Sequence, residues 1–541
     1  MTLKNISTLL AMVFVAARLN AADEVASPSG GGKKLLVFVL AGQSNMQGHS
    51  DVSTLAYLPK PAYVPTKEEW AVMTGGLVRE IRLKSEASIR DELLKDPANA
   101  KLPKAEFGAL VQKALNAEVE KARNERYENF KQRQTDPVRA ARDRELAAIF
   151  TPNLTDQKVL DTIAATKNMR NARELANAWQ TRLNLPVGKH TFIAAYGGVN
   201  RDVEPGLATG PLSTGYGAGP SAIGPEYAFG IMLEKSLNQP ILIIKTAWGG
   251  KSLHYDFRPP SAGPFELNAS QKEQVQQWQA KKAAWDKYIA DGGTPAVMEQ
   301  KQKDIKSFDT QKRKLQDEIR KLSKEEQSVQ KQKIADLSAK IKELNQSLIA
   351  PPGKAPAYDK AGFYWNEMIG FVHKVLADPK AYHPEYDPKA GFEVAGALWF
   401  QGFNDQFSPE FYGNYSNNMV HFIQDLRQEV KQPKMPFVIG VLGTDAFPAG
   451  AMANNVSKAQ RAAATTPELA GTVAAVESWP LTTPEVGLWR TPKAGGKEAK
   501  SSQEWPLYGS NLGYHYDGSG RFFIRFGDEC ATAMLNLMGK K

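Results

Sequence analysis

The sequence predicts an α/β fold, a doubly wound and mostly parallel five-stranded sheet interrupted by two long helical insertions. Five segments are continuously apolar, which is typical of strands covered on both faces, and helical patterns separate them. Strands that alternate with helices favour right-handed parallel crossovers. The predicted strands are 35–41, 240–245, 394–400, 437–442 and 472–477.

Two charged segments fall outside this alternation. Residues 65–185 are rich in Ala, Lys, Arg and Glu and separate the first two strands by far more than an ordinary crossover. Residues 265–350 carry Ile and Leu in three-four spacing, for example Ile334 and Leu337, which predicts a short coiled-coil seam. A helical hairpin is favoured over a dimerising rod because the seam is short and interrupted. We expect one domain, residues 35–541, decorated by both insertions.

The N-terminal segment has the features of an export signal. Lys4 precedes a mostly apolar run that ends at Ala17, and small residues follow. This pattern predicts a signal peptide at 1–22 and a polar linker at 23–34, and therefore a periplasmic or extracellular protein. The run is too short to span a membrane. An ordinary N-terminal core helix is the alternative.

Charge and cysteine content narrow the function classes. The net charge is +10, but the Lys and Arg excess is spread over stretches that also carry many Glu and Asp. Such mixed charge is typical of solvated helix faces, so we expect no nucleic-acid partner. The single cysteine, Cys530, excludes an intramolecular disulfide and argues against thiolate zinc sites. We expect no metal.

Ser44 is the first candidate functional residue. It follows the first predicted strand in AGQSNMQG, between Gly42 and Gly48. In doubly wound sheets, ligands bind at the carboxyl ends of the strands. A serine on such a turn is exposed enough to act as a nucleophile. The alternative is that Ser44 only caps the following helix.

A base and oxyanion donors are also present at predicted strand ends and loops. His515 lies in the late loop YGSNLGYHYDGSG, and an early serine with a late loop histidine is the arrangement of a Ser-His hydrolase. A purely structural hydrogen bond is the alternative for His515. Gly249 and Gly250 follow the second strand and Asn404 follows the third. With the N–H of Ser44 these groups could form an oxyanion hole.

Together the motifs GQSNMQG, GPE, KTAWGGKSL, WFQGFND and GYHY resemble a known family. They are similar to the sialate O-acetylesterase and acetyl xylan esterase group of carbohydrate esterases, within the SGNH hydrolase superfamily. The resemblance covers residues 35–60, 190–260 and 360–538. It implies a flavodoxin-like fold and removal of O-acetyl groups from a glycan through an acetyl-enzyme, with no cofactor.

The resemblance also implies roles for single residues. Ser44 matches the nucleophile and His515 the base. The candidate oxyanion donors are the N–H of Ser44, Gly249 or Gly250, and Asn404 or the alternative Gln401.

Two positions depart from the family pattern. The superfamily usually has an aspartate three residues before its histidine, where this chain has Leu512, preceded by Asn511. The group often has Glu after QG, where this chain has Phe403. An imidazole can also be oriented by a backbone carbonyl. The candidate orienting acids are Asp517 and, as alternatives, Asp405 and Glu226.

Two rival functions remain, the first of which is motivated by the missing aspartate and the large helical insertions. One is a catalytically weak or inactive carbohydrate-binding or scaffold protein on an esterase fold, and the other is a lipid esterase, which would need a larger apolar surface. Several aromatic residues could stack on a sugar ring or belong to the core. They are Trp248, Trp399, Phe403, Phe407 and Trp479.

Overall fold

The computed structural model describes residues 32–73, 75–151, 155–166, 182–198, 206–319, 323–356, 358, 360–444, 454–483, 485–487 and 505–540. The predicted signal peptide and most of the linker lie outside these residues. The chain divides into two compact units. The second unit is Tyr255–Trp365, and the first comprises the parts of the chain before and after it.

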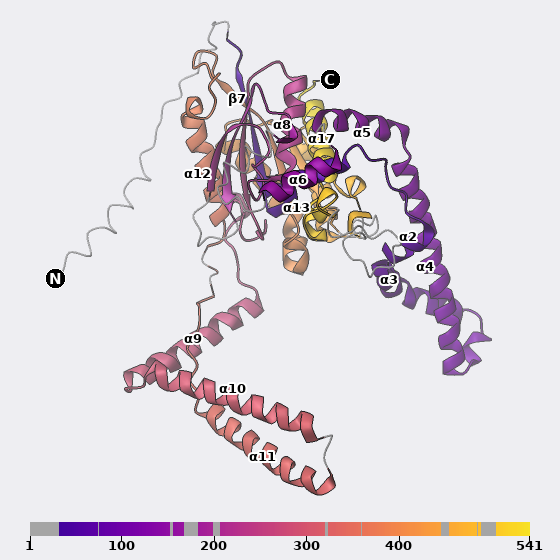
Figure 1. The fold of residues 1–541 in the computed structure, drawn as a ribbon, viewed down its shortest axis with the longest axis vertical. Coiled ribbons are helices and arrows are strands. Elements are labelled where there is room, and N and C mark those ends of the chain that lie inside the picture. The colour runs from indigo at the N-terminus through magenta and orange to yellow at the C-terminus, as the bar shows by residue number, and fades with distance from the viewer. Residues whose placement is uncertain are drawn as a thin grey trace, which may run out of the picture. The chain divides into compact units, whose positions relative to one another are not determined.

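The first unit is built on a seven-stranded sheet (Figure 1) in the order β4-β3-β6-β1-β7-β8-β9. The five predicted strands are all present and pair in parallel. Their bounds are β1 Leu35–Gly42, β6 Ile241–Trp248, β7 Phe392–Phe400, β8 Phe437–Val441 and β9 Val473–Glu477. The α/β class and the mostly parallel sheet are therefore confirmed.

The predicted number of strands is wrong, because two more strands extend one edge. β3, Thr191–Gly198, pairs in parallel with β6, and β4, Gly206–Pro211, pairs antiparallel with β3. β4 is mostly exposed and β3 is partly exposed. The edge strand β4 and its partly exposed neighbour β3 need no continuous apolar run, which is the signal that the five-strand prediction depended on.

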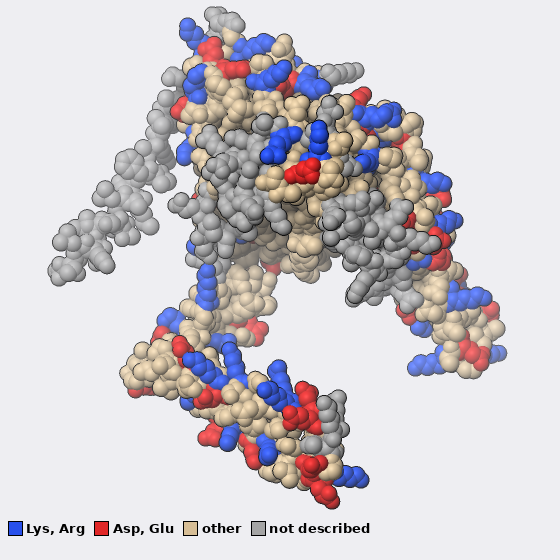
Figure 2. All heavy atoms as spheres, viewed as in Figure 1, with Lys and Arg blue, Asp and Glu red and all other residues tan. Residues whose placement is uncertain are grey.

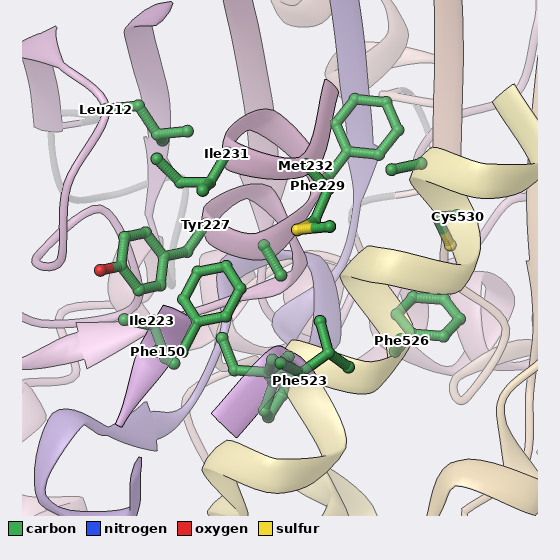
Figure 3. Packing of buried hydrophobic residues seen from close by; sticks show 14 of the residues in the cluster. Phe150, Leu212, Ile223, Tyr227, Phe229, Ile231, Met232, Phe523, Phe526 and Cys530 are labelled. Carbon is green, nitrogen blue, oxygen red and sulfur yellow. The ribbon is translucent and has the colours of Figure 1, made fainter. Parts of the chain in front are cut away.

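Helices cover the sheet, and both faces of β1 are buried. The helices along the sheet are α8 Pro225–Ser236, α12 Phe363–Ala377, α13 Pro409–Glu429, α15 Asn455–Ala464 and α17 Gly520–Leu537. α8 and α17 pack against each other over one face (Figure 3). Phe229 meets Phe38 of β1 edge to face at 5.8 Å, and Cys530 is fully buried in the same cluster.

The segment predicted as the first insertion is helical where the structure describes it. It contains α2 Lys67–Met73, α3 Gly75–Leu94, α4 Lys104–Gln134, α5 Pro137–Phe150 and α6 Asp156–Thr166. α5 joins the core, because Phe150 is fully buried against Tyr227 at 5.3 Å between ring centroids. Ion pairs link α5 to α17, including Arg142 to Asp528 at 2.6 Å.

The second unit is mainly helical. It contains α9 Ala269–Ala290, α10 Pro295–Glu318 and α11 Lys324–Gln346. α10 and α11 pack against each other as an antiparallel pair (Figure 1). Lys and Arg side chains alternate with Asp and Glu over these two helices (Figure 2), as expected for solvated faces. The coiled-coil seam stays a prediction.

Short elements complete the first unit near the carboxyl ends of the strands. α1, Ser44–Gln47, follows β1 directly. A two-stranded antiparallel pair, β2 Ser50–Asp51 with β5 Ala222–Ile223, follows α1. Among the described residues, no helix is long and apolar enough to cross a membrane.

Candidate active site

Ser44 lies at the carboxyl end of the central strand β1. It is the first residue of α1 and 9% exposed, and the residue that caps α1 is Gln43. Ser44 therefore does not serve as the helix cap. The turn needs glycine at Gly42, because a Cβ there would overlap the carbonyl of Phe400 on β7. The sequence thus brings the serine to the strand end by a close approach of two backbones.

A hydrogen bond between the residues next to Ser44 and His515 joins the two loops. The side-chain amide of Asn45 donates to the carbonyl oxygen of Tyr514 at 3.1 Å. Tyr514 and His515 belong to a short helical turn, Gly513–Gly518. The loop that carries Ser44 and the loop that carries His515, from opposite ends of the chain, are thus in contact.

Asn511 holds the imidazole of His515. Nδ1 of His515 lies 3.0 Å from Oδ1 of Asn511, and the same oxygen accepts the N–H of Leu512 at 2.8 Å. An amide oxygen only accepts hydrogen bonds, so Nδ1 carries the proton and Nε2 keeps its lone pair. This is the tautomer that a general base requires.

None of the three predicted carboxylates holds the His515 ring, and Asp517 is the nearest to it in sequence. Its backbone carbonyl accepts the N–H groups of Ser510 and Asn511 at 3.0 and 3.1 Å. Its carboxylate faces Gly487, 3.3 Å from where a Cβ would stand on that glycine. Asp517 therefore fixes the backbone that presents Asn511.

The loop conformation explains why Asn511 takes this place. Tyr516 and Asp517 both have left-handed backbone angles, with φ of 52° and 56°. Leu512, at the position where the superfamily has aspartate, is 46% exposed. The turn thus directs residue 511, rather than 512, against the imidazole ring. The superfamily's spacing of three residues between the orienting residue and the histidine therefore does not hold in this chain.

Asp405 is a structural acceptor. It is fully buried and accepts the N–H groups of Leu253 and His254 at 2.9 and 3.0 Å. It also accepts Nε2 of Gln401 at 2.6 Å. Asp405 thus fixes the loop after β6 to the loop after β7, which holds the candidate oxyanion residues in place.

Glu226 is also engaged elsewhere. It is fully buried, pairs with Nζ of Lys245 at 2.7 Å and accepts the N–H of Gly224 at 2.9 Å. Burial raises the pKa of Glu226 and lowers the pKa of Lys245. Lys245 also donates to the carbonyl of Gln47 at 2.8 Å, at the end of α1. The pair therefore supports the turn that carries Ser44.

His49 is a site residue that the sequence reasoning missed. Its ring stacks on His515 with 3.9 Å between centroids and 7° between planes. Burial lowers the pKa of His515 to about 3, with a smaller contribution from the neighbouring His49. Burial and the charge of Lys245 lower the pKa of His49 to about 4. Both imidazoles are therefore neutral at neutral pH. The sequence signal for His49 is its position directly after Gly48 in GQSNMQGH, next to the loop of Ser44.

The two candidate oxyanion glycines differ in their hydrogen bonds. The N–H of Gly249 donates to the carbonyl of Gly198 at 3.2 Å. Gly249 stands beside the nucleophile, since a Cβ there would lie 3.9 Å from Cβ of Ser44. Gly250 accepts Nδ2 of Asn404 through its carbonyl at 2.5 Å. Gly249 therefore already uses its N–H within the protein.

The two candidate amides also differ. Gln401 is 2% exposed, and its Nε2 lies within hydrogen-bond distance of Asp405 and of the carbonyl of Lys251, at 2.6 and 2.8 Å. Its Oε1 accepts the hydroxyl of Tyr415 at 3.0 Å. Asn404 is half-buried and retains a second N–H beside its bond to Gly250. Asn404 is the better placed of the two to donate to a ligand.

Within the described part of the chain, no group of three or more His, Cys, Asp or Glu residues could hold a metal ion. The site described above consists of a serine, two imidazoles, an amide acceptor and loop donors. Such a set of groups can carry acyl transfer.

Comparisons with solved structures found weak likeness. A protein from Arabidopsis thaliana has a TM-score of 0.29 and 12% identity, over 65% of this chain and 82% of that one. A carbohydrate acetylesterase from Xanthomonas citri has a TM-score of 0.24 and 12% identity, over 55% of this chain and 44% of that one. Scores this low do not establish a common fold. No curated protein matches the chain.

A family model gives the informative match. The family described as carbohydrate esterase, sialic acid-specific acetylesterase, matches residues 358–485. This segment contains β7, β8 and β9 with the WFQGFND loop. Residues 358–485 are therefore similar to the sialic acid-specific acetylesterase family of carbohydrate esterases, which confirms the predicted resemblance for this segment.

Proposed function

We propose that the protein is a serine esterase that removes O-acetyl groups from a carbohydrate through an acetyl-enzyme. The observation that carries the proposal is the hydrogen bond from Nδ1 of His515 to Asn511, which leaves Nε2 as a base. The link between Asn45 and Tyr514 supports it by joining the loops of Ser44 and His515. The family match over 358–485 supports the carbohydrate ester as substrate.

In the proposed mechanism Nε2 of His515 accepts the hydroxyl proton of Ser44 while Oγ attacks the acetyl carbonyl carbon. The sugar oxygen then leaves as the C–O bond breaks, and Nε2 returns the proton to it. A water molecule next loses its proton to Nε2 and attacks the acetyl-enzyme. Nε2 returns this proton to Oγ as the bond between Oγ and the acetyl carbon breaks, which regenerates Ser44. The product leaves as acetic acid, which ionises to acetate by releasing a proton to solvent.

The tetrahedral intermediate needs hydrogen-bond donors for its oxyanion. We assign the N–H of Ser44, the N–H of Gly250 and Nδ2 of Asn404. Gly250 is preferred to Gly249 because the N–H of Gly249 already binds Gly198. Asn404 is preferred to Gln401 because Gln401 is buried among its partners.

Asn511 takes the position that an aspartate fills in a Ser-His-Asp triad. An amide oxygen fixes the tautomer and orientation of the imidazole, as in Cys-His-Asn proteases. It does not carry the negative charge that would stabilise the imidazolium formed during the reaction. We therefore expect catalysis that is slower than in a carboxylate triad but still dependent on Ser44.

The test is hydrolysis of 4-nitrophenyl acetate and of acetylated sugars by the wild type and Ser44→Ala. We expect the substitution to lower kcat by at least about 10³-fold, because the nucleophile is lost. Ser213→Ala is the matched control, since its hydroxyl donates to the adjacent Thr214 carbonyl and not to the site. Equal and negligible rates in wild type and Ser44→Ala would instead support a carbohydrate-binding protein.

Export is part of the proposal. The motivating feature is the sequence of residues 1–22, a basic start followed by an apolar run and small residues. Expression of the full chain in bacteria followed by fractionation and intact-mass measurement tests it. We expect a product shortened near residue 22 outside the cytoplasm, and a full-length cytoplasmic product would contradict the proposal.

A further inference from the structure

The structure separates the aromatic residues near the strand ends into two groups. Trp248, Trp399 and Trp479 are 1%, 0% and 8% exposed and belong to the core. Phe407, in contrast, is 70% exposed, and Phe403 is half-buried beside it. These two phenylalanines, rather than the tryptophans, are available to a ligand.

Phe403, Phe407 and Tyr514 form a continuous surface, which we name the aromatic platform. The ring of Phe403 lies 5.3 Å from that of Phe407 and 5.8 Å from that of Tyr514, between centroids. Tyr514 is 40% exposed and meets His515 edge to face at 4.4 Å. The platform therefore extends outward from the proposed catalytic base.

Polar contacts hold the two loops of the platform in place. Asn404, next to Phe403, donates to the carbonyl of Gly250, and the carbonyl of Tyr514 accepts the Asn45 amide. Gln406, next to Phe407, accepts Nδ2 of Asn454 at 2.9 Å. The exposed rings thus sit on anchored backbone, so little conformational entropy is lost when a ligand binds.

The aromatic rings of the platform favour one class of ligand. Contiguous exposed aromatic rings on a folded protein mark a binding surface. The C–H face of a pyranose can stack on such rings, because the electron-rich ring faces attract the partly positive hydrogens. A carboxylate on the sugar would meet the negative ring faces and lose its water, which is unfavourable.

We propose that the aromatic platform binds a neutral pyranose ring of the acetylated substrate and directs its ester to Ser44. The inference rests on the proposed function for the position of the reacting ester. It adds a sugar-binding subsite and a preference for neutral glycans, such as acetylated xylo-oligosaccharides, over O-acetylated sialic acid.

Kinetics with Phe407→Ala and Phe407→Trp test the subsite. Phe407 is the chosen position because its ring is the most exposed and the farthest along the platform from His515. We expect Phe407→Ala to lower kcat/KM for acetylated xylo-oligosaccharides about tenfold relative to kcat/KM for 4-nitrophenyl acetate, mainly through KM. Phe407→Trp keeps a stacking face and should retain the ratio. An unchanged ratio in Phe407→Ala would overturn the proposal.

A matched control comes from an exposed apolar residue that belongs to the second unit. Val329 on α11 is 58% exposed, and Val329→Ala should keep the wild-type ratio. A fall of the ratio in this variant as large as in Phe407→Ala would show a general effect of apolar surface and overturn the subsite.

Binding without catalysis separates this inference from the proposed function. Calorimetric titration of Ser44→Ala with acetylated xylo-oligosaccharides should give a Kd about tenfold lower than for the Ser44→Ala, Phe407→Ala double variant. If the wild type hydrolyses no ester, the proposed function fails while this titration still measures the platform. Equal Kd values in the two variants, or tighter binding of O-acetylated sialic acid than of the neutral sugar, would overturn the inference.

Discussion

Asn511 is the residue on which the proposed mechanism depends most directly. Its Oδ1 is the acceptor at Nδ1 of His515, so Asn511→Ala frees the ring to change tautomer and orientation. We expect kcat for 4-nitrophenyl acetate to fall about 10²–10⁴-fold with little change in KM, by comparison with triads that lose their orienting group. A kcat within twofold of wild type, in a variant with unchanged circular dichroism, would remove Asn511 from the mechanism.

Asn511→Asp is the matched variant, and we expect it to retain activity. A carboxylate in this place would stabilise the imidazolium and raise the pKa of His515. We expect a kcat at or above the wild-type value at neutral pH, and an acid limb of activity at higher pH than in the wild type. If Asn511→Asp loses activity as Asn511→Ala does, the amide has a role other than holding the ring.

The pH dependence of kcat/KM follows from the environment of His515. Burial lowers its pKa to about 3, the stacked His49 adds to the effect, and the ring of Tyr514 also contacts the imidazole. The base is active when unprotonated, so activity is retained as pH falls past 6 and is lost only as pH approaches the lowered pKa. Hydrolysis of 4-nitrophenyl acetate from pH 3 to 8 should show no midpoint near 6.5, and such a midpoint would contradict this environment.

The sequence predicted Ser44 and His515 because both positions carry local signals. Ser44 follows a buried strand, and His515 lies in a loop of Gly, Ser and Tyr. Asn511 and His49 could not be predicted in the same way. The role of Asn511 depends on two left-handed residues downstream, and the role of His49 depends on ring stacking across the fold. These are tertiary effects that spacing along the chain does not encode.

At the scale of elements, the predicted strands share a physical basis. Each of the five is an apolar run, and pairing in parallel with cover on both faces requires such runs. β4 was missed because an edge strand satisfies its hydrogen bonds on one side and tolerates glycine and exposed side chains. β3 pairs on both sides, but its second half is only partly buried and ends in two glycines, so it has no long buried apolar run. The sequence therefore predicted the centre of the sheet, which positions the site, and missed one edge.

α5 and α17 are joined by ion pairs whose acids are partly or fully buried. Arg142 binds Asp528, which is 3% exposed, and Arg525 binds Asp143 at 2.5 Å. Removal of Arg142 leaves a buried carboxylate without its partner, which is costly. We expect Arg142→Ala to lower the free energy of unfolding by about 1–3 kcal/mol, less than for a fully buried pair because Arg142 is partly exposed.

A double-mutant cycle in urea separates this pair from loss of packing. The coupling energy between Arg142→Ala and Asp528→Ala should exceed about 1 kcal/mol. The exposed pair of Arg90 with Glu86 on α3 is the control and should give less than about 0.5 kcal/mol. Equal coupling in both pairs would mean that the Arg142–Asp528 pair contributes no more to stability than an exposed pair.

At the scale of the whole molecule, the proposed site belongs to one of the two units. The nucleophile, base, orienting amide, oxyanion donors and aromatic platform all lie in the first unit. The second unit, Tyr255–Trp365, is compact by itself, and the side chains of its helices are mostly polar and charged. We therefore expect the proposed catalytic residues to act without the helices of the second unit, provided that the chain can be closed after these helices are removed.

Backbone hydrogen bonds show where the chain can be joined after the helices of the second unit are removed. The carbonyl of Tyr255 accepts the N–H of Gly362 at 2.8 Å, and that of Asp256 accepts the N–H of Tyr364 at 3.0 Å. The chain thus leaves and returns side by side, so a short Gly/Ser linker can replace residues 265–350 at a small entropic cost. We expect cooperative unfolding and kcat for 4-nitrophenyl acetate within about threefold of wild type, abolished by Ser44→Ala. A folded variant that has lost this Ser44-dependent activity would show that the helical unit takes part in catalysis.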